Sequence, residues 1–417
     1  MKIAVWHNLP SGGGKRALYD HVRGLVKRGH TVESWCPPTA DQTYLPLSSI
    51  IREHVIPLRW TVPARHPANR LLPLSWNTAT QLKAMEQHCR QCAAEINRGG
   101  YDLLFANSCM FFRTPPISRF TKIPKLLYLQ EPARWLYEAM PRLPWIALPS
   151  PGKRWSHLTH LKTFVKHMIK LRGYRIQARE ELANAQAFTL ILVNSLFSRE
   201  SVLRVYGIDS KVCYLGVNMD TFVNRHQERE HFVVGIGAFV LEKNIHLVIN
   251  ALACVTHPRP HLVWIGNVAD PAYLAELQQL AHSLGVAFEP KLRIDDHELI
   301  DLLNRAKMMV YAPRLEPFGY APLEANACGL PVIAVAEGGV RETIKDGVNG
   351  LLVEHDAHAM AMAIQRLLNE PSYAQQLGGQ GYALIAEEWS VDAAISRLER
   401  RLMELAKYDI AGHLAHV

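Results

Sequence analysis

The stretch from Tyr311 to Val353 constrains the fold of this chain most, because its prolines and glycines fix the order of its elements. Met308 to Tyr311 is a short apolar run that predicts a buried strand. A helix is expected after the following loop, since Pro322 fits only the first turn of a helix, where its missing N–H has no partner. Gly329 ends that helix, and the apolar run 332–335 predicts a second buried strand.

Two carboxylates lie in this strand, loop, helix and strand unit, with the start of the expected helix between them. Glu316 belongs to the loop and Glu324 to the helix, and Phe318 and Gly319 stand where the helix begins. A helix N-terminus presents unpaired N–H groups and a partial positive charge, which suits a diphosphate. Carboxylates repel phosphate and accept hydrogen bonds from hydroxyl groups. The pattern therefore indicates a phosphate ligand flanked by hydroxyl-rich groups, although a merely solvated helix is the alternative.

The same residues carry a family resemblance. A Glu, seven residues and a second Glu, with Pro-Phe-Gly after the first, resemble the signature of the family 4 retaining glycosyltransferases of the GT-B fold. The neighbouring Ala-Cys-Gly-Leu-Pro-Val-Ile and Asp-Gly-Val-Asn-Gly-Leu-Leu-Val are similar to that family as well. The resemblance implies that Glu316 contacts the donor sugar as a catalytic residue and that Glu324 holds the ribose. It also implies that the amides of Phe318 and Gly319 meet the diphosphate.

Strand-like and helix-like segments alternate along both halves of the chain, which predicts an α/β fold of two doubly wound parallel sheets. At 417 residues the chain is too long for one ordinary core. We expect a Rossmann-like acceptor-binding domain over 1–223 and a Rossmann-like donor-binding domain over 224–388, with a cleft between them. The resemblance implies that the last segment, 389–417, is a helix that crosses back to the N-terminal domain.

A triple-glycine turn follows the first predicted strand. Gly12, Gly13 and Gly14 do not form the G-x-G-x-x-G or P-loop patterns, which weakens dinucleotide-binding and ATPase interpretations. A tight turn that needs positive φ and a ligand-binding loop are equally good explanations from the residues alone. The resemblance favours binding, because the family carries a Gly-Gly loop here that faces the donor phosphates and the acceptor. Arg16 keeps the family's basic residue, whereas Lys15 replaces an acid.

Lys243 follows the first strand of the second half, and the resemblance makes it the cationic contact to the donor phosphates. An ammonium there would neutralise the leaving nucleoside diphosphate; a solvated lysine at a helix start is the alternative. Two positions depart from the family. Ala238 stands where many relatives have Arg, and Gln130 stands where many have His, so Gln130 can donate a hydrogen bond but cannot titrate.

Residues 151–180 contain eight Lys or Arg and one Glu, so they supply +7 of the formal net charge of +8. Apolar residues recur at helical spacing beside a lysine stripe, a pattern that suits an anionic membrane surface. A surface helix packed on its own domain is the alternative. The run lacks a recognised nucleic-acid-binding motif, so we do not expect nucleic acid as a partner.

The seven cysteines are odd in number and scattered, which indicates reduced thiols. Cys89 and Cys92 form a C-x-x-C within a helix-like run, and an ordinary pair on a helix is favoured over a metal or redox site. Apolar runs are too short for a signal peptide or a membrane span. We therefore expect a cytoplasmic protein, in part associated with the inner face of the membrane. No acidic group has the pattern of a metal site, so we expect no metal or other cofactor.

These features predict a retaining glycosyltransferase that moves a hexose from a nucleoside-diphosphate sugar, a UDP- or GDP-sugar, to a hydroxyl acceptor. The acceptor expected from the basic helix is a lipid-linked or cell-envelope glycan precursor. A sugar synthase or epimerase on the same fold is one alternative, because fold does not fix chemistry. A noncatalytic nucleotide-sugar-binding subunit is another, and Ala238 and Gln130 are its main support.

Overall fold

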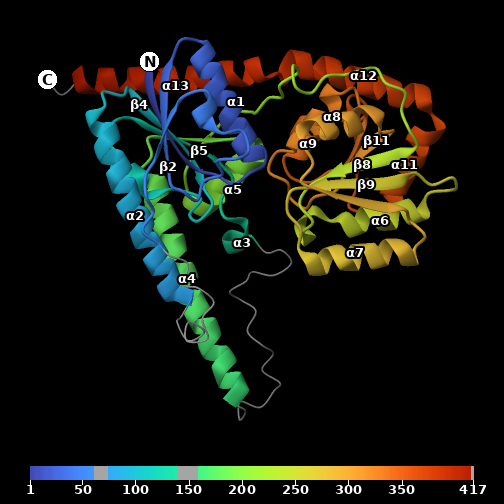
Figure 1. The fold of residues 1–417 in the computed structure, drawn as a ribbon, viewed down its shortest axis with the longest axis horizontal. Helices are drawn as coiled ribbons and strands as arrows, with labels where there is room; N and C mark the ends of the chain where they lie inside the picture. The colour runs from blue at the N-terminus through green and yellow to red at the C-terminus, as the bar shows by residue number, and fades with distance from the viewer. Residues whose placement is uncertain (61–73, 139–157, 415–417) are drawn as a thin grey trace. The chain divides into compact units, whose positions relative to one another are not determined.

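A computed structural model of the chain describes residues 1–60, 74–138 and 158–414 (Figure 1). The chain divides into two compact units. Unit 1 comprises Met1–Val193, Arg199–Val212 and Leu398–Val417, and unit 2 comprises Asn194–Ser198 and Cys213–Arg397. Within the described ranges, no helix combines the length and the apolar character that crossing a membrane requires.

Unit 1 is built on a parallel sheet of seven strands in the order β3-β2-β1-β4-β5-β6-β7. The strands are β1 (Lys2–Asn8), β2 (Thr31–Cys36), β3 (Arg52–Val55), β4 (Leu103–Cys109), β5 (Lys125–Gln130), β6 (Leu190–Val193) and β7 (Lys211–Val212). The central strands β1 and β4 are buried along almost their whole length because both faces of the sheet are covered. The chain reverses its direction of winding at β1, which has β2 on one side and β4 on the other.

Helices cover both faces of this sheet. They are α1 (Gly13–Lys27), α2 (Leu74–Arg98), the short α3 (Arg134–Tyr137), α4 (Leu158–Gln186), α5 (Leu196–Tyr206) and the end of α13 (Val391–Leu414). Helices α2 and α4 pack along each other (Figure 1). Cys89 and Cys92 of α2 are fully buried in the hydrophobic core under the sheet, as expected for ordinary helix residues. The 151–157 part of the basic segment lies outside the described residues.

Unit 2 contains a second parallel sheet, of six strands in the order β10-β9-β8-β11-β12-β13. The strands are β8 (Phe232–Ile236), β9 (His261–Gly266), β10 (Phe288–Leu292), β11 (Met308–Tyr311), β12 (Val332–Val335) and β13 (Gly350–Val353). The helices are α6 (Ile245–Cys254), α7 (Pro271–Ser283), α8 (Asp296–Arg305), α9 (Tyr320–Ala327), α10 (Val340–Thr343), α11 (Ala357–Asn369) and α12 (Pro371–Glu388). The prediction of two doubly wound parallel sheets is therefore confirmed.

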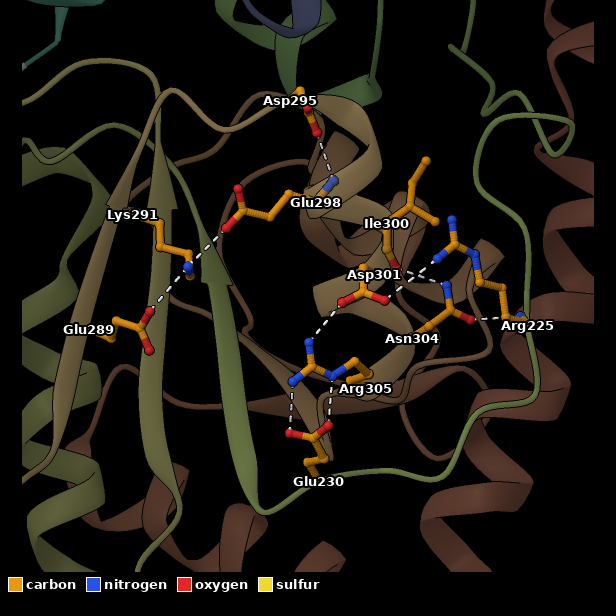
Figure 2. A network of polar contacts seen from close by, with 10 residues as sticks. All are labelled: Arg225, Glu230, Glu289, Lys291, Asp295, Glu298, Ile300, Asp301, Asn304 and Arg305. Carbon is orange, nitrogen blue, oxygen red and sulfur yellow. Dashed lines mark hydrogen bonds and ion pairs between the residues drawn. The ribbon is translucent and has the colours of Figure 1, made fainter.

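The polar segment 224–231, which precedes β8, is fixed to helix α8 by a network of side chains (Figure 2). Glu230 accepts hydrogen bonds from Nε and Nη2 of Arg305 at 2.6 and 3.0 Å, and Asp301 accepts a third from Nη1 at 2.8 Å. Asn304 accepts a hydrogen bond at 2.7 Å from the backbone N–H of Arg225. The segment before β8 therefore has a defined course along the C-terminal half of α8.

Two strands were missing from the sequence prediction. β3 reads Arg-Glu-His-Val, and it lies at the edge of its sheet with both end residues exposed, so it lacks an apolar run. β13 forms the end of the Asp-Gly-Val-Asn-Gly-Leu-Leu-Val run, which the sequence analysis did not identify as a strand. The polar, partly exposed side chains of β3 explain why it was missed; β13 is apolar, Gly-Leu-Leu-Val, and its pattern was present in the sequence.

Candidate functional site

The loops after β8 and β11 meet in unit 2. The strand order places β9 on one side of β8 and β11 on the other, so the winding reverses between β8 and β11. In parallel α/β sheets, ligands bind at such a reversal, beyond the carboxyl ends of the strands. Lys243 lies in the first loop and Glu316 in the second.

Lys243 ends a single 3₁₀ turn, Leu241–Lys243, that precedes helix α6. Its aliphatic stem lies against Gly237: a Cβ on Gly237 would come within 3.0 Å of Cδ and 3.1 Å of Cγ of Lys243. Asn244 turns the chain into the helix with a left-handed φ of 56°. The glycine before Ala238 therefore makes room for the lysine side chain.

Lys243 and Glu316 form an ion pair, with Nζ 2.7 Å from Oε2. Their side chains are 24% and 16% exposed, so both charged ends are reachable by a ligand while their stems are packed. The residues predicted to contact the donor phosphates and the donor sugar thus lie in direct contact. This contact was not expected from the sequence, which assigned the two residues separately.

The backbone of the Glu316 loop is held from behind by a pair of glycines. The N–H of Gly339 donates to the carbonyl of Glu316 at 2.7 Å. A Cβ at Gly338 would lie 2.2 Å from that carbonyl oxygen, and a Cβ at Gly339 would lie 2.1 Å from the carbonyl oxygen of Pro317. Only residues without a side chain allow this approach, so the glycine pair sets the position of the loop.

Gly319 is the cap residue of α9, with a left-handed φ of 86°. A side chain there would meet Val340 at 3.1 Å and Thr343 at 3.2 Å. The preceding Phe318 is buried, and Pro322 lies in the first turn of α9 as predicted. The start of α9 therefore presents its first-turn backbone N–H groups beside Gly319, a suitable arrangement for an anion.

Glu324 is buried, at 7% exposure, on the second turn of α9. Tyr311, at the end of β11, is close enough to Glu316 and Glu324 for both carboxylates to raise the pKa of its phenol, in addition to the larger effect of burial. Tyr311 is thus an uncharged hydroxyl beside both predicted carboxylates. Sequence analysis assigned it only to the strand, although its position at the carboxyl end of a buried strand is a signal for a site residue.

Glu342 has a structural role within unit 2. Its carboxylate accepts hydrogen bonds from the N–H groups of Leu196 and Phe197 at 2.8 and 3.0 Å, at the start of α5. It also accepts one from the hydroxyl of Tyr214 at 2.9 Å. Burial and this hydrogen bond raise the pKa of Tyr214 to about 12. These contacts indicate that Glu342 caps the start of a helix.

Gly12, Gly13, Gly14 and Arg16 belong to unit 1, at the start of α1. Gly12 has a φ of 132°, which favours glycine. Arg16 is largely buried, with its guanidinium 5.5 Å from the centre of the Tyr44 ring. The turn therefore needs glycine at position 12, and Arg16 contacts the Tyr44 ring within unit 1.

Gln130 faces the glycine turn from the end of β5. A Cβ on Gly14 would lie 3.0 Å from Nε2 of Gln130. Gln130 has a left-handed φ of 65°, which is uncommon outside glycine. Its Nε2 is buried, and no hydrogen-bond acceptor for it occurs among the described residues. A strained backbone and an unused buried donor at the carboxyl edge of a sheet are typical of a ligand-contacting position.

Comparison with known proteins decides the family. The model of the family described as "Glycosyl transferases group 1" matches residues 218–384, which include every predicted site residue of unit 2. This match assigns residues 218–384 to the group 1 glycosyltransferases. This family, also called GT4, was the one that the paired glutamates resemble.

Curated relatives of this group 1 protein are distant. It is 28% identical over 275 residues to human alpha-1,3/1,6-mannosyltransferase ALG2, covering 60% of this chain and 65% of that protein. It is 27% identical over 282 residues to D-inositol 3-phosphate glycosyltransferase of Streptosporangium roseum, covering 60% of this chain and 64% of the relative. The alignments thus span slightly less than two thirds of the relatives' length.

Solved structures of similar fold cover nearly the whole group 1 chain. Sucrose-phosphate synthase of Thermosynechococcus elongatus matches with a TM-score of 0.72 at 20% identity, over 97% of this chain and 98% of that one. Anabaena HepE, solved in complex with UDP-glucose, matches with a TM-score of 0.66 at 19% identity, over 97% and 100% of the two chains. These likenesses establish the GT-B fold.

Proposed function

We propose that this protein is a retaining glycosyltransferase that transfers a hexose from a UDP- or GDP-sugar to a hydroxyl group of a lipid-linked or cell-envelope glycan precursor. The observation that carries the proposal is the contact between Lys243 and Glu316 at the point where the sheet of unit 2 reverses its winding. Family membership supports the reaction class. Anabaena HepE, which binds UDP-glucose, supports a nucleotide sugar as the donor.

In the proposed reaction, the bond between the anomeric carbon and the nucleoside diphosphate breaks, and a bond to the acceptor oxygen forms on the same face of the sugar. The O–H bond of the acceptor breaks as well, and its proton leaves with the diphosphate. The leaving diphosphate gains negative charge, which the ammonium of Lys243 and the N–H groups at Gly319 would neutralise. Glu316 would accept hydrogen bonds from the donor sugar, and Glu324 from the ribose hydroxyls.

The test is thermal unfolding of the wild type and of Glu324→Ala with UDP-, GDP- and ADP-sugars. A ligand at 100 times its Kd stabilises the folded protein by about 2.7 kcal/mol. We expect one class of nucleotide sugar to raise the melting temperature of the wild type, and Glu324→Ala to lose that rise. If no nucleotide sugar shifts the wild type, the donor assignment is wrong.

A noncatalytic nucleotide-sugar-binding subunit is the second candidate, favoured by the departures at Ala238 and Gln130. It predicts a melting shift with a donor, and no transfer to water, sugar or lipid-linked acceptors. Turnover of a donor that binds would exclude it. The variant Gln130→His separates the two further, because restored or increased transfer identifies this position as limiting in an active enzyme.

The choice of a membrane-linked acceptor rests on helix α4 in unit 1. Among its described side chains, Val165 and Met168 are each 47% exposed, beside the exposed Lys170. Apolar and basic groups together suit an anionic lipid surface, each base contributing about 1 kcal/mol near it. The proposal places the enzyme at the cytoplasmic face of a membrane, and the absence of disulfides among its seven cysteines agrees with a reducing compartment.

Vesicle sedimentation tests this contact. We expect binding to vesicles of phosphatidylglycerol and phosphatidylcholine, weakened by salt, and little binding to phosphatidylcholine alone. Val165→Gln with Met168→Gln should lower binding, whereas Leu203→Gln, which removes a 50% exposed leucine from α5, should not. Equal binding by all three proteins, or no binding to anionic vesicles, would contradict the proposal.

A further inference from the structure

A second group of chemically reactive side chains lies in unit 1, on three neighbouring strands. His7 is on β1, Cys36 ends β2, and Glu53 is on β3. One potential ligand atom from each residue lies within 4.8 Å of the other two. His7 and Cys36 are fully buried, and the Glu53 side chain is 1% exposed.

The register of the sheet explains why these three side chains meet. Val5 pairs with Ser34, and Ser34 pairs with Glu53. Side chains two residues apart on a strand share one face. Val5, Ser34 and Glu53 therefore lie side by side on one face of the sheet. His7 lies two residues after Val5, and Cys36 lies two residues after Ser34, so both project from the same face as Glu53. No local motif indicated this group, because Cys36 lies 29 positions after His7 and Glu53 lies 17 positions after Cys36 along the chain.

We propose that His7, Cys36 and Glu53 bind one divalent transition-metal ion of the zinc class. An imidazole nitrogen, a thiolate and a carboxylate oxygen are the ligand types that zinc takes in proteins. A ring nitrogen of His7, Nε2, lies 2.9 Å from Oε1 of Glu53. Tetrahedral ligands bound at about 2.0–2.2 Å to a common ion lie about 3.3–3.6 Å from one another, so the observed spacing of His7 and Glu53 requires little movement.

Buried atoms without partners at this place support a missing cation. Oε2 of Glu53 and Nδ1 of His7 are both buried, and neither has a hydrogen-bond partner within the described part of the chain. Buried polar atoms in proteins are nearly always paired. A bound ion would satisfy the carboxylate directly, and the two orientations of the imidazole ring offer it either nitrogen.

Neighbouring side chains already resemble an outer shell of ligands. Nε2 of Gln42 donates to Sγ of Cys36 at 3.4 Å, and the hydroxyl of Ser34 donates to Oε1 of Glu53 at 3.2 Å. Hydrogen bonds of this kind orient metal ligands and stabilise a thiolate. Ser34 lies on β2 and Gln42 in the loop after it. These two hydrogen bonds therefore orient the side chains of Glu53 and Cys36 without a bound ion.

The charges at this place balance when the ion is present. Lys15 is fully buried on α1, its Nζ has no hydrogen-bond partner among the described residues, and Glu53, Cys36 and Asp41 act on it electrostatically. Metal binding releases the thiol proton of Cys36 to solvent. The thiolate and the two carboxylates then carry three negative charges, which match the divalent ion and the Lys15 ammonium.

Titration with Co²⁺ tests the site without using transferase activity. The full-length protein is kept reduced, freed of metal with a chelator, and titrated with Co²⁺. We expect one equivalent to bind with a thiolate-to-cobalt absorption band in the near ultraviolet, and one equivalent of Zn²⁺ to remove that band, since zinc binds more tightly. A wild-type titration without this band overturns the proposal.

Matched variants assign the ligands. Cys36→Ser should abolish the band, whereas Cys254→Ser, which changes the exposed cysteine of unit 2, should leave it intact. If Cys36→Ser fails to fold, Glu53→Gln decides, because it keeps the size of the side chain and removes its charge. We expect it to weaken Co²⁺ binding by about 100-fold or more, since outer-shell changes alone cost 10–100-fold. Unchanged binding in either folded variant would overturn the proposal.

Discussion

Nζ of Lys243 lies 2.7 Å from Oε2 of Glu316, across the boundary between β8 and β11. The two side chains pair with each other when no donor is bound. A donor that binds here would either contact both side chains while they remain paired or separate them. A phosphate near Lys243 would compete with the carboxylate for the ammonium, which would leave Glu316 available for a sugar hydroxyl. In the proposed reaction, the pair would thus link recognition of the two halves of a nucleotide sugar.

Removal of the Lys243 charge should damage transfer more than folding. We expect Lys243→Ala to lower kcat/KM by roughly 10²–10³, the usual effect of removing one group that stabilises developing charge. Lys345→Ala, which removes a half-exposed lysine paired with Glu388, is the matched control. Initial rates with the donor identified by thermal unfolding provide the measurement, and equal rates for the two variants would refute the role of Lys243.

Asn349 should be essential for the stability of unit 2. It is fully buried: its Nδ2 donates to Asn326 at 2.8 Å and to the carbonyl of Thr343 at 2.9 Å, and its Oδ1 accepts from the N–H of Lys345 at 2.7 Å. Asn349→Ala leaves these partners unpaired at about 1–3 kcal/mol each. Urea unfolding should show a loss of about 3 kcal/mol or more, against little change for Asn369→Ala at the exposed end of α11.

Arg229 should matter for stability although it lies in the polar segment 224–231, before β8. Its guanidinium donates to carbonyl groups at the ends of α8 and α9, those of Leu303, Asn304, Ala306, Cys328 and Gly329. Burial lowers its pKa. Arg229→Met should therefore destabilise the fold by about 3 kcal/mol or more.

Arg204→Met is the control for this change, because Arg204 is a 71% exposed residue of α5. Surface substitutions of this kind change stability by about 0.5 kcal/mol or less. Similar urea midpoints for Arg229→Met and Arg204→Met would show that the carbonyl contacts of Arg229 contribute little.

Glu399 should make unit 1 sensitive to acid. Its carboxylate lies 2.8 Å from Nε2 of His30 and 2.6 Å from Nη1 of Arg28. The hydrogen bond from His30, followed by that from Arg28, lowers the pKa of Glu399 below its ordinary value of 4.5. The folded state then binds a proton less readily than the unfolded state, so this stabilisation is complete above pH 4.5 and disappears as the pH falls through the lowered pKa.

Thermal unfolding of the wild type and Glu399→Gln across this range tests the direction. The wild type should melt at the higher temperature near neutral pH, and the difference should shrink as the solution is acidified below pH 4.5. A difference that is constant with pH would mean that the charge of Glu399 is not its source.

Much of the fold of unit 2 could be predicted, because its strands are buried on both faces. The runs 308–311 and 332–335 are apolar throughout and were predicted with the bounds that the structure has. The edge strand β3 was missed, since its side chains are polar and partly exposed. Local pattern therefore identifies the centre of a sheet better than its border.

The residues of the candidate site could be predicted singly, and their contacts could not. Glu316 and Glu324 stand in one local motif, whereas Lys243 is 73 residues away from Glu316 along the chain. Their contact depends on the order of strands in the sheet, which spacing along the chain does not encode. The same holds for His7, Cys36 and Glu53, which only the register of three strands brings together.

The division of the chain into its two units has a practical consequence for chimeric enzymes. Unit 2 takes the short segment Asn194–Ser198 in addition to Cys213–Arg397. Glu342 holds the N–H groups of Leu196 and Phe197 in that segment. An exchange of unit 2 with that of a relative should therefore include both Asn194–Ser198 and Cys213–Arg397. If only the long segment were exchanged, the relative's residue at position 342 would face the N–H groups of Leu196 and Phe197 of this chain.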